Sequence, residues 1–148
     1  MCNESKLYRT CRCGGVMTIH MHTLIYKAKV KISRVPVFMC RTCFQYEPHP
    51  AVKRDLSLMI QNLGSNPEIT SLSFIERNEW ASVLNDTFNG FQGEDHDLEQ
   101  AVQQAMSARI DLLLDLFRIA SEAADPVWMG EIESRLLKLI SHTASKVS

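Results

Sequence analysis

The chain lacks the features that mark membrane and secreted proteins. Its 148 residues contain no apolar run of about 18 residues, the length that crosses a bilayer. Its first segment, MCNESKLYRT, has neither the apolar core nor the small-residue cleavage pattern of a secretory signal. We therefore expect no membrane partner and a cytoplasmic location.

The chain also lacks the short motifs that mark common active sites. It has no GxSxG, no glycine-rich phosphate-binding loop and no HExxH. We therefore expect a protein that is not an enzyme. An unrecognised enzyme remains the least favoured alternative, because a buried histidine or carboxylate pair leaves no signature in the sequence.

The composition is that of an ordinary globular protein, but the charge is divided along the chain. Residues 1–54 hold ten Lys or Arg and two Glu, a net charge of +8, whereas the rest of the chain carries −9. Such an asymmetry predicts two surfaces with different partners. The alternative is that the two parts simply attract each other.

Four of the five cysteines form two close pairs, Cys11 with Cys13 and Cys40 with Cys43. The cytoplasm keeps thiols reduced, and four thiolates suit tetrahedral zinc, so this spacing favours a metal over disulfides. Four protein ligands leave no open position, which predicts a structural Zn²⁺ site. The alternatives are four unrelated thiols or a redox pair at Cys40 and Cys43, and we interpret Cys2 as a free thiol.

Residues near the cysteines fit the metal hypothesis. Gly14 and Gly15 allow a tight turn that directs backbone amides toward the sulfurs, and Phe44 is a side chain that could cover the site. His20, His22 and His49 are other potential ligands. Because all four thiols are present, we interpret these histidines as surface or strand residues.

Alternation of apolar and polar residues predicts β-structure between the two cysteine pairs. Residues 16–22 and 26–32 each alternate with a period of two and meet near Thr23, where either a hairpin turn or a bulge joins them. A third strand, Val35 to Cys40, then returns the second cysteine pair to the first. Pro36 fits near the start of this strand or at a sheet edge.

A row of lysines, Lys27, Lys29 and Lys31, is expected on one face of this ribbon. Such a row is more often a solvated face or edge protection than a binding surface. The alternative is that these lysines, together with Arg34 and Arg41, contact the phosphates of a nucleic acid.

These residues resemble the N-terminal zinc module of the YgiT-type zinc-finger family. CRCGG, the lysine-bearing hairpin and VPVFMCRTCFQ are similar to that module over about residues 9–60, although the family has C-x2-C at the first pair. The resemblance implies that Cys11, Cys13, Cys40 and Cys43 bind zinc. Family members include antitoxins that continue into a helix-turn-helix, a motif we do not recognise in the remainder of this chain.

Helical periodicity dominates after the second cysteine pair. A helix over residues 51–64 ends the zinc module, with Val52, Leu56, Met59, Ile60 and Leu63 on one face. Residues 65–71 read as a linker, so we expect two domains, 1–64 and 65–148. The second contains helices over about 73–87, 97–124 and 126–142; Ser73 with Glu76 predicts a capping box, and Asp125 with Pro126 another helix start.

The long helix is apolar on more than one face at IDLLLDLF. Such a helix is either buried on several sides or meets another chain. The candidate interaction face consists of Leu112, Leu114, Leu116 and Phe117. A homodimer or another protein would cover it.

We therefore predict an α+β protein: a small antiparallel β zinc ribbon, then an all-α acidic domain with a long antiparallel helical hairpin. The favoured function is a non-catalytic regulatory or adaptor protein that acts by protein–protein interaction. The alternative is a nucleic-acid-binding transcriptional regulator or antitoxin-like protein that uses the basic ribbon.

Overall fold

The computed structural model describes residues 7–91 and 97–144, and these form two compact units. The first unit extends to Ala81 and contains the sheet, whereas the second begins at Ser82 and is helical. The predicted α+β class is thus confirmed. Cys2 lies outside the described residues, so its interpretation stays a prediction.

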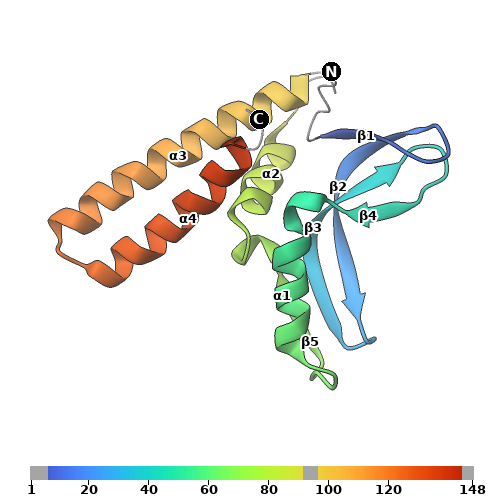
Figure 1. The fold of residues 1–148 in the computed structure, drawn as a ribbon, viewed down its shortest axis with the longest axis horizontal. Helices are drawn as coiled ribbons and strands as arrows, with labels where there is room; N and C mark the ends of the chain where they lie inside the picture. The colour runs from blue at the N-terminus through green and yellow to red at the C-terminus, as the bar shows by residue number, and fades with distance from the viewer. Residues whose placement is uncertain (1–6, 92–96, 145–148) are drawn as a thin grey trace. The chain divides into compact units, whose positions relative to one another are not determined.

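The sheet of the first unit is built around one long curved hairpin (Figure 1). The strand order is β1-β2-β3-β4, all antiparallel, and β5 pairs in parallel with the first part of β3. The strands are β1 Tyr8–Thr10, β2 Val16–Tyr26, β3 Val30–Cys40, β4 Tyr46–Pro48 and β5 Thr70–Ser73.

The hairpin turn lies at Lys27 and Ala28 rather than near Thr23. Both residues have left-handed φ angles, 52° and 59°, and the Lys29 amide donates to the Tyr26 carbonyl at 3.0 Å, the arrangement of a type I′ turn. At Thr23 the strand continues through a register shift, so the bulge alternative is correct there. Lysine and alanine do not favour this conformation, so the turn could not be predicted from the residue types at these positions.

Pro36 lies in the middle of β3, where a missing amide would normally cost a ladder hydrogen bond. Its carbonyl accepts from the His49 amide at 3.0 Å, so the missing amide faces the same side as β4. On that side β5 pairs with residues only to Ser33 and β4 only from Val37. The proline therefore fits a gap between two short strands.

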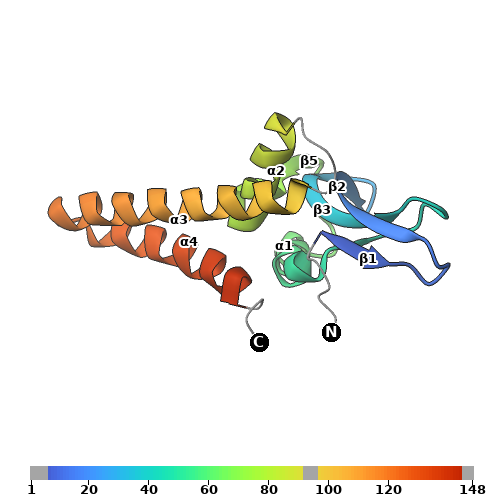
Figure 2. The same cartoon turned by 90° about the horizontal axis from the view of Figure 1, so that it is seen from above.

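Two short 3-10 helices and α1 Lys53–Leu63 complete the connections of the first unit. The 3-10 helices are η1 Pro50–Val52 and η2 Phe74–Glu76, and α1 runs beside β3 in Figures 1 and 2. As predicted, Val52, Leu56 and Met59 are buried. Gly64 ends the helix with a φ of 76°, a value that only glycine adopts at little cost.

The division between the units lies later in the chain than the expected boundary at Gly64. Residues 70–73 add to the sheet as β5, and the buried side chains of Phe74 and Trp80 belong to the first unit. The capping box at Ser73 is wrong, because its hydroxyl is buried and has no hydrogen-bond partner within residues 7–91 and 97–144. Helix α2, Glu79–Gly90, is instead capped by Asn78, whose Oδ1 accepts from the Ala81 amide at 2.8 Å.

The second unit is formed by the greater part of α2 together with α3 Leu98–Glu122 and α4 Pro126–Ala144. Helices α3 and α4 lie side by side and run in opposite directions (Figures 1 and 2). Asp125 caps α4 as predicted, since its Oδ1 accepts from the Trp128 amide at 3.1 Å. The buried apolar side chains of these two helices are Val102, Met106, Leu113, Ala120, Ile132, Leu136 and Leu139.

Ile140 of α4 is 44% exposed, because the buried positions of this helix follow Ile132, Leu136 and Leu139 and leave the next residue on the flank. Within residues 7–91 and 97–144, the helices that are present are too short or too polar to cross a membrane.

Candidate metal centre

Two turns bring the four cysteines to one end of the sheet. Cys11 follows β1, and its carbonyl accepts from the Gly14 amide at 2.9 Å, which closes the turn that carries Cys13. Cys40 is the last residue of β3, and its carbonyl accepts from the Phe44 amide at 3.1 Å, which closes the turn that carries Cys43. We call these the first and the second knuckle.

The sheet register places the knuckles opposite each other. Met17 of β2 is the cross-strand partner of Cys40, and Arg9 of β1 is the partner of Met17. The two knuckles therefore begin at the same end of the sheet, at the ends of β1 and β3 on either side of β2. Cysteines separated by 26 residues in sequence become neighbours because two antiparallel ladders share β2.

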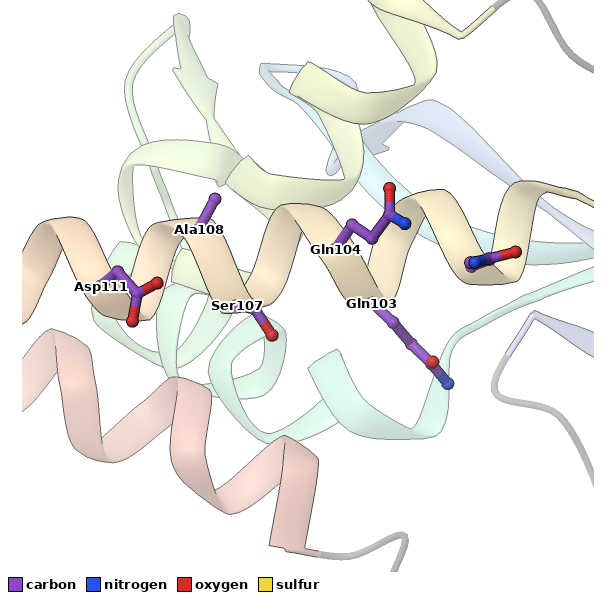
Figure 3. A pocket seen from close by; sticks show the side chains of 6 residues that line it. Gln103, Gln104, Ser107, Ala108 and Asp111 are labelled. Atoms are coloured by element: carbon purple, nitrogen blue, oxygen red, sulfur yellow. The ribbon is translucent and has the colours of Figure 1, made fainter.

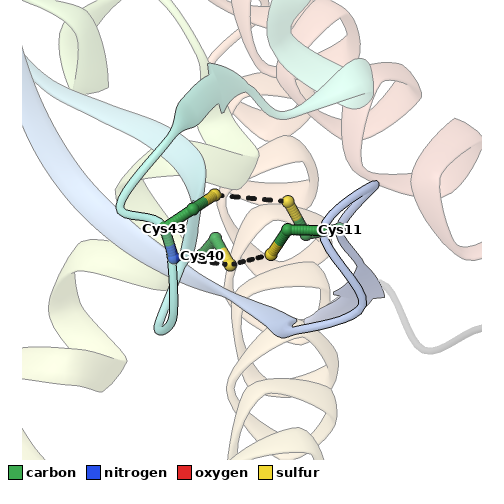
Figure 4. Close-up of side chains that lie close together, drawn as sticks. Cys11, Cys40 and Cys43 are labelled. Atoms are coloured by element: carbon green, nitrogen blue, oxygen red, sulfur yellow. Dashed lines mark hydrogen bonds between the residues drawn. The ribbon is translucent and has the colours of Figure 1, made fainter.

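The four sulfur atoms lie within 4.8 Å of one another (Figure 4). The Cys11 and Cys43 sulfurs are 3.6 Å apart, and the Cys13 and Cys40 sulfurs are 3.5 Å apart. A disulfide requires about 2.05 Å, and the described cysteines are free thiols. Tetrahedral coordination with metal–sulfur bonds of about 2.3 Å needs sulfurs roughly 3.8 Å apart, so the cluster fits a metal ion.

Backbone amides prepare the cluster for negative charge. The amides of Thr42 and Cys43 donate to the Cys40 sulfur at 3.3 and 3.4 Å, and the Gly15 amide donates to the Cys13 sulfur at 3.4 Å. The bond from Cys43, followed by those from Thr42 and the Cys13 thiol, outweighs burial and lowers the pKa of Cys40 to about 6. These hydrogen bonds therefore favour the thiolate form of Cys40.

Cys43 is shifted in the opposite direction. The Gln45 amide lowers its pKa, but burial and the bonds with Cys11, Cys40 and Cys13 raise it more, to about 12. Four thiols at this spacing cannot all ionise without a cation, because like charges repel strongly at a few ångströms. A divalent metal would replace the protons and relieve that repulsion.

Gly15 is required by packing rather than by its backbone angle. A Cβ at this position would lie 2.6 Å from Thr42 Oγ1 and 3.0 Å from the Cys40 sulfur. Gly14 differs, since a Cβ there would meet open space but its φ of 94° disfavours other residues. The two glycines of CRCGG therefore serve separate purposes, which the sequence did not distinguish.

The other candidate ligands lie elsewhere. His49 is 5% exposed and stacks between Phe38 and Trp80, with ring centroids at 4.6 and 4.7 Å. Its Nδ1 accepts from the Ala51 amide at 3.0 Å. Phe44 is 71% exposed, so it is not a buried cover over the sulfurs.

The basic residues do not form the expected row. Lys27 and Lys29 belong to the hairpin turn, and Lys29 donates to Asn66 Oδ1 at 3.1 Å. Arg41 follows Cys40 at the opposite end of β3, about 30 Å from Lys31 at the usual strand rise. The predicted lysine face is therefore wrong as a continuous strip, although Lys31 and Arg34 are exposed.

The candidate interaction residues of α3 do not share one face either. Leu112 and Leu114 are 50% and 52% exposed, but they lie on opposite sides of the buried Leu113, about 200° apart around the helix. Leu116 and Phe117 are half-buried. Ile119, which is 45% exposed and was not among the predicted residues, lies on the same flank as Leu112, because seven residues make nearly two turns.

The polar side of α3 carries a shallow hollow of about 480 Å³ (Figure 3). All of its lining residues come from this one helix: Gln100, Gln103, Gln104, Ser107, Ala108 and Asp111. Amides, one hydroxyl and one carboxylate without a positioned base or cation do not form a catalytic constellation. The thiol cluster is therefore the candidate functional site.

Comparison with known proteins adds no identity: no family model, curated protein or solved structure matches the chain. The resemblance to the YgiT-type module accordingly stays a prediction.

Proposed function

We propose that the four cysteines bind a structural Zn²⁺ ion and that the first unit is a zinc ribbon. The proposal rests on the donor set, since four thiolates are the ligands that zinc prefers in structural sites. A complete sulfur quartet leaves no position for water or substrate. Zinc would hold the two knuckles together and take no part in chemistry.

On this basis the protein is a non-catalytic adaptor that acts by binding another protein through its second unit. The observation that carries this function is the apolar flank of α3, which we define as Leu112, Leu116 and Ile119. Their spacing of four and three residues aligns them on one side of the helix, as in helices that pack against a partner.

The exposure and the charged surroundings of this flank support an interface with another protein. Its two ends are about half exposed although Leu and Ile gain about 1.5–3 kcal/mol each when fully buried. Arg118 lies among acidic neighbours, 3.9 Å from Asp115 and 3.7 Å from Glu122, which gives the helix a charged rim. An apolar centre with a charged rim is the usual anatomy of a protein interface.

The test uses the full chain and compares the two flanks of α3. A Leu112→Asp/Ile119→Asp variant should lose the partner captured from cell extract by the unmodified chain. Leu114→Asp, an equally exposed leucine on the other flank, is the matched control and should retain it. Light scattering of the unmodified chain decides whether the partner is a second copy, since a homodimer would have twice the mass of the monomer.

Nuclease treatment separates this function from its alternative. Capture by the apolar flank should be unaffected when nucleic acid is digested. Capture that persists in the double variant after nuclease treatment, or the absence of any partner of the unmodified chain after that treatment, would contradict the proposal.

A further inference from the structure

The outer side of the knuckle end carries exposed aromatic and basic side chains that the proposed function does not use. Side chains alternate between the two faces of a strand, so His20 and His22 of β2 point to the same face. Thr18 of β2 pairs with Met39 of β3, and Met39 pairs with Tyr46 of β4. Because cross-strand partners point to the same face, the side chain of Tyr46 belongs to that face as well. Arg41 joins them, since its amide donates to the carbonyl of Val16 at 3.1 Å.

Contacts between these side chains agree with the register. The His22 and Tyr46 rings stack with centroids 5.2 Å apart and an angle of 28° between their planes, and His20 meets His22 edge-on at 6.4 Å. Burial first, and then the charges of His22 and Arg41, lower the pKa of His20. The Tyr46 ring is thus held in place by a neighbour while the residue stays 52% exposed.

A hollow of about 240 Å³ adjoins Tyr46 at the edge of the first knuckle. It is lined by β1, the knuckle and β4, including Arg9, Arg12 and Gln45. The Arg9 guanidinium is paired with Glu47 at 2.6 Å, whereas Arg12 has no hydrogen bond or ion pair within residues 7–91 and 97–144. Arg12 lies between Cys11 and Cys13, and Arg41 follows Cys40, so the metal centre would position both guanidinium groups.

We define the knuckle surface as Arg12, His20, His22, Arg41 and Tyr46, and we propose that it binds single-stranded nucleic acid. A base stacks on the Tyr46 ring, while Arg12 and Arg41 contact phosphates on either side of it. An unpaired strand fits better than a duplex, because the bases of a duplex are already stacked and cannot reach an aromatic side chain. The net charge of +5 on the first unit favours a polyanion, and the −6 of the second unit does not.

The experiment measures fluorescence anisotropy of labelled 12-nucleotide RNA and DNA strands of mixed sequence, and of the matching duplex, with the zinc-loaded full chain. Both single strands should bind more tightly than the duplex. Tyr46→Ala should weaken single-strand binding about 5- to 100-fold, the effect of losing one stacked base, and Tyr46→Phe should retain it. Arg12→Gln and Arg41→Gln should each reduce the slope of log affinity against log salt by about 0.7.

Lys27→Gln and Lys31→Gln are the matched controls, because they remove the same charge at the other end of the hairpin. These two lysine variants should leave the stacking of a base on Tyr46 unchanged. No anisotropy change with either single strand, tighter binding of the duplex, or an equal loss with the lysine and tyrosine variants would overturn the proposal.

Two further measurements keep this result independent of the rest of the molecule. Zinc content is determined for every variant, and the comparison of Tyr46→Ala with Tyr46→Phe decides the proposal if an arginine variant loses metal. The Leu112→Asp/Ile119→Asp variant should bind the strands as the unmodified chain does, so failure of the protein interface and failure of the nucleic-acid surface are distinguishable.

Discussion

The two units of this protein differ in what stabilises them. The first unit combines an apolar core, which includes Ile32, Phe74 and Trp80, with a cluster of four thiols that accept backbone amide hydrogen bonds and a buried histidine stacked between two aromatic rings. The second depends on apolar side chains spread along two helices. A metal bound by these sulfurs, as proposed, would add to the stability of the first unit, because metal binding and folding would then be coupled.

The effect of a mutation should differ between the two units. Loss of one thiol should affect the other three at once, because in the proposed site the four sulfurs form one coordination set. When one apolar contact in the second unit is lost, the apolar contacts of the remaining helical turns are retained. Substitutions in the thiol cluster should therefore be more damaging than substitutions of single apolar residues in the second unit.

The largest expected effect is that of Cys40→Ser. Metal binding and folding of a small zinc module are one equilibrium, so the variant should lose zinc and the first unit should unfold. Elemental analysis measures the metal, and hydrogen exchange measures the loss of protection in β2 and β3 separately from α3 and α4. Cys2→Ser is the matched control and should keep about one zinc per chain; an unmodified protein purified without chelator and free of zinc would refute the metal site.

A smaller effect is expected when one glycine of each unit is replaced by alanine. Gly15→Ala forces a methyl group against Thr42 and the Cys40 sulfur, and overpacking of this kind costs about 1–3 kcal/mol. Gly130→Ala in α4 meets no neighbour within 4 Å and should stabilise the helix by about 0.5–1 kcal/mol. Chemical denaturation with exchange readout gives both values, and equal signs for the two variants would contradict the contrast between the units.

The smallest expected effect concerns the N-terminal cap of helix α2, which connects the two units. Asn78→Ala removes the acceptor for the Ala81 amide and the donor to Asp55 Oδ2 at 2.8 Å, which should cost about 1–2 kcal/mol. Ser73→Ala removes a buried hydroxyl that has no hydrogen-bond partner, so it should be neutral or slightly stabilising. Hydrogen-exchange protection at the start of α2 distinguishes the two variants. A greater loss of protection in Ser73→Ala than in Asn78→Ala would support the capping box predicted from the sequence.

The features that could be predicted from the sequence depend on the properties of nearby residues alone. The spacing of four cysteines indicated the thiol cluster because donor type and number are properties of side chains. The buried face of α1 followed from its 3.6-residue period, and the start of α4 from the preferences of Asp125 and Pro126 for the first positions of a helix.

Contacts between segments that are distant in sequence determined the turn, the strand pairing and the neighbours within the sheet. The turn at Lys27 and Ala28 adopts left-handed angles that neither residue prefers, because the ladder between β2 and β3 fixes the register. The pairing of Thr70–Ser73 with β3, and with it the later division of the chain at Ala81, depends on a strand edge that exists only after the hairpin has formed. The same ladders bring His22 to Tyr46 and Cys11 to Cys43, since sequence periodicity specifies the face of a strand but not its neighbour.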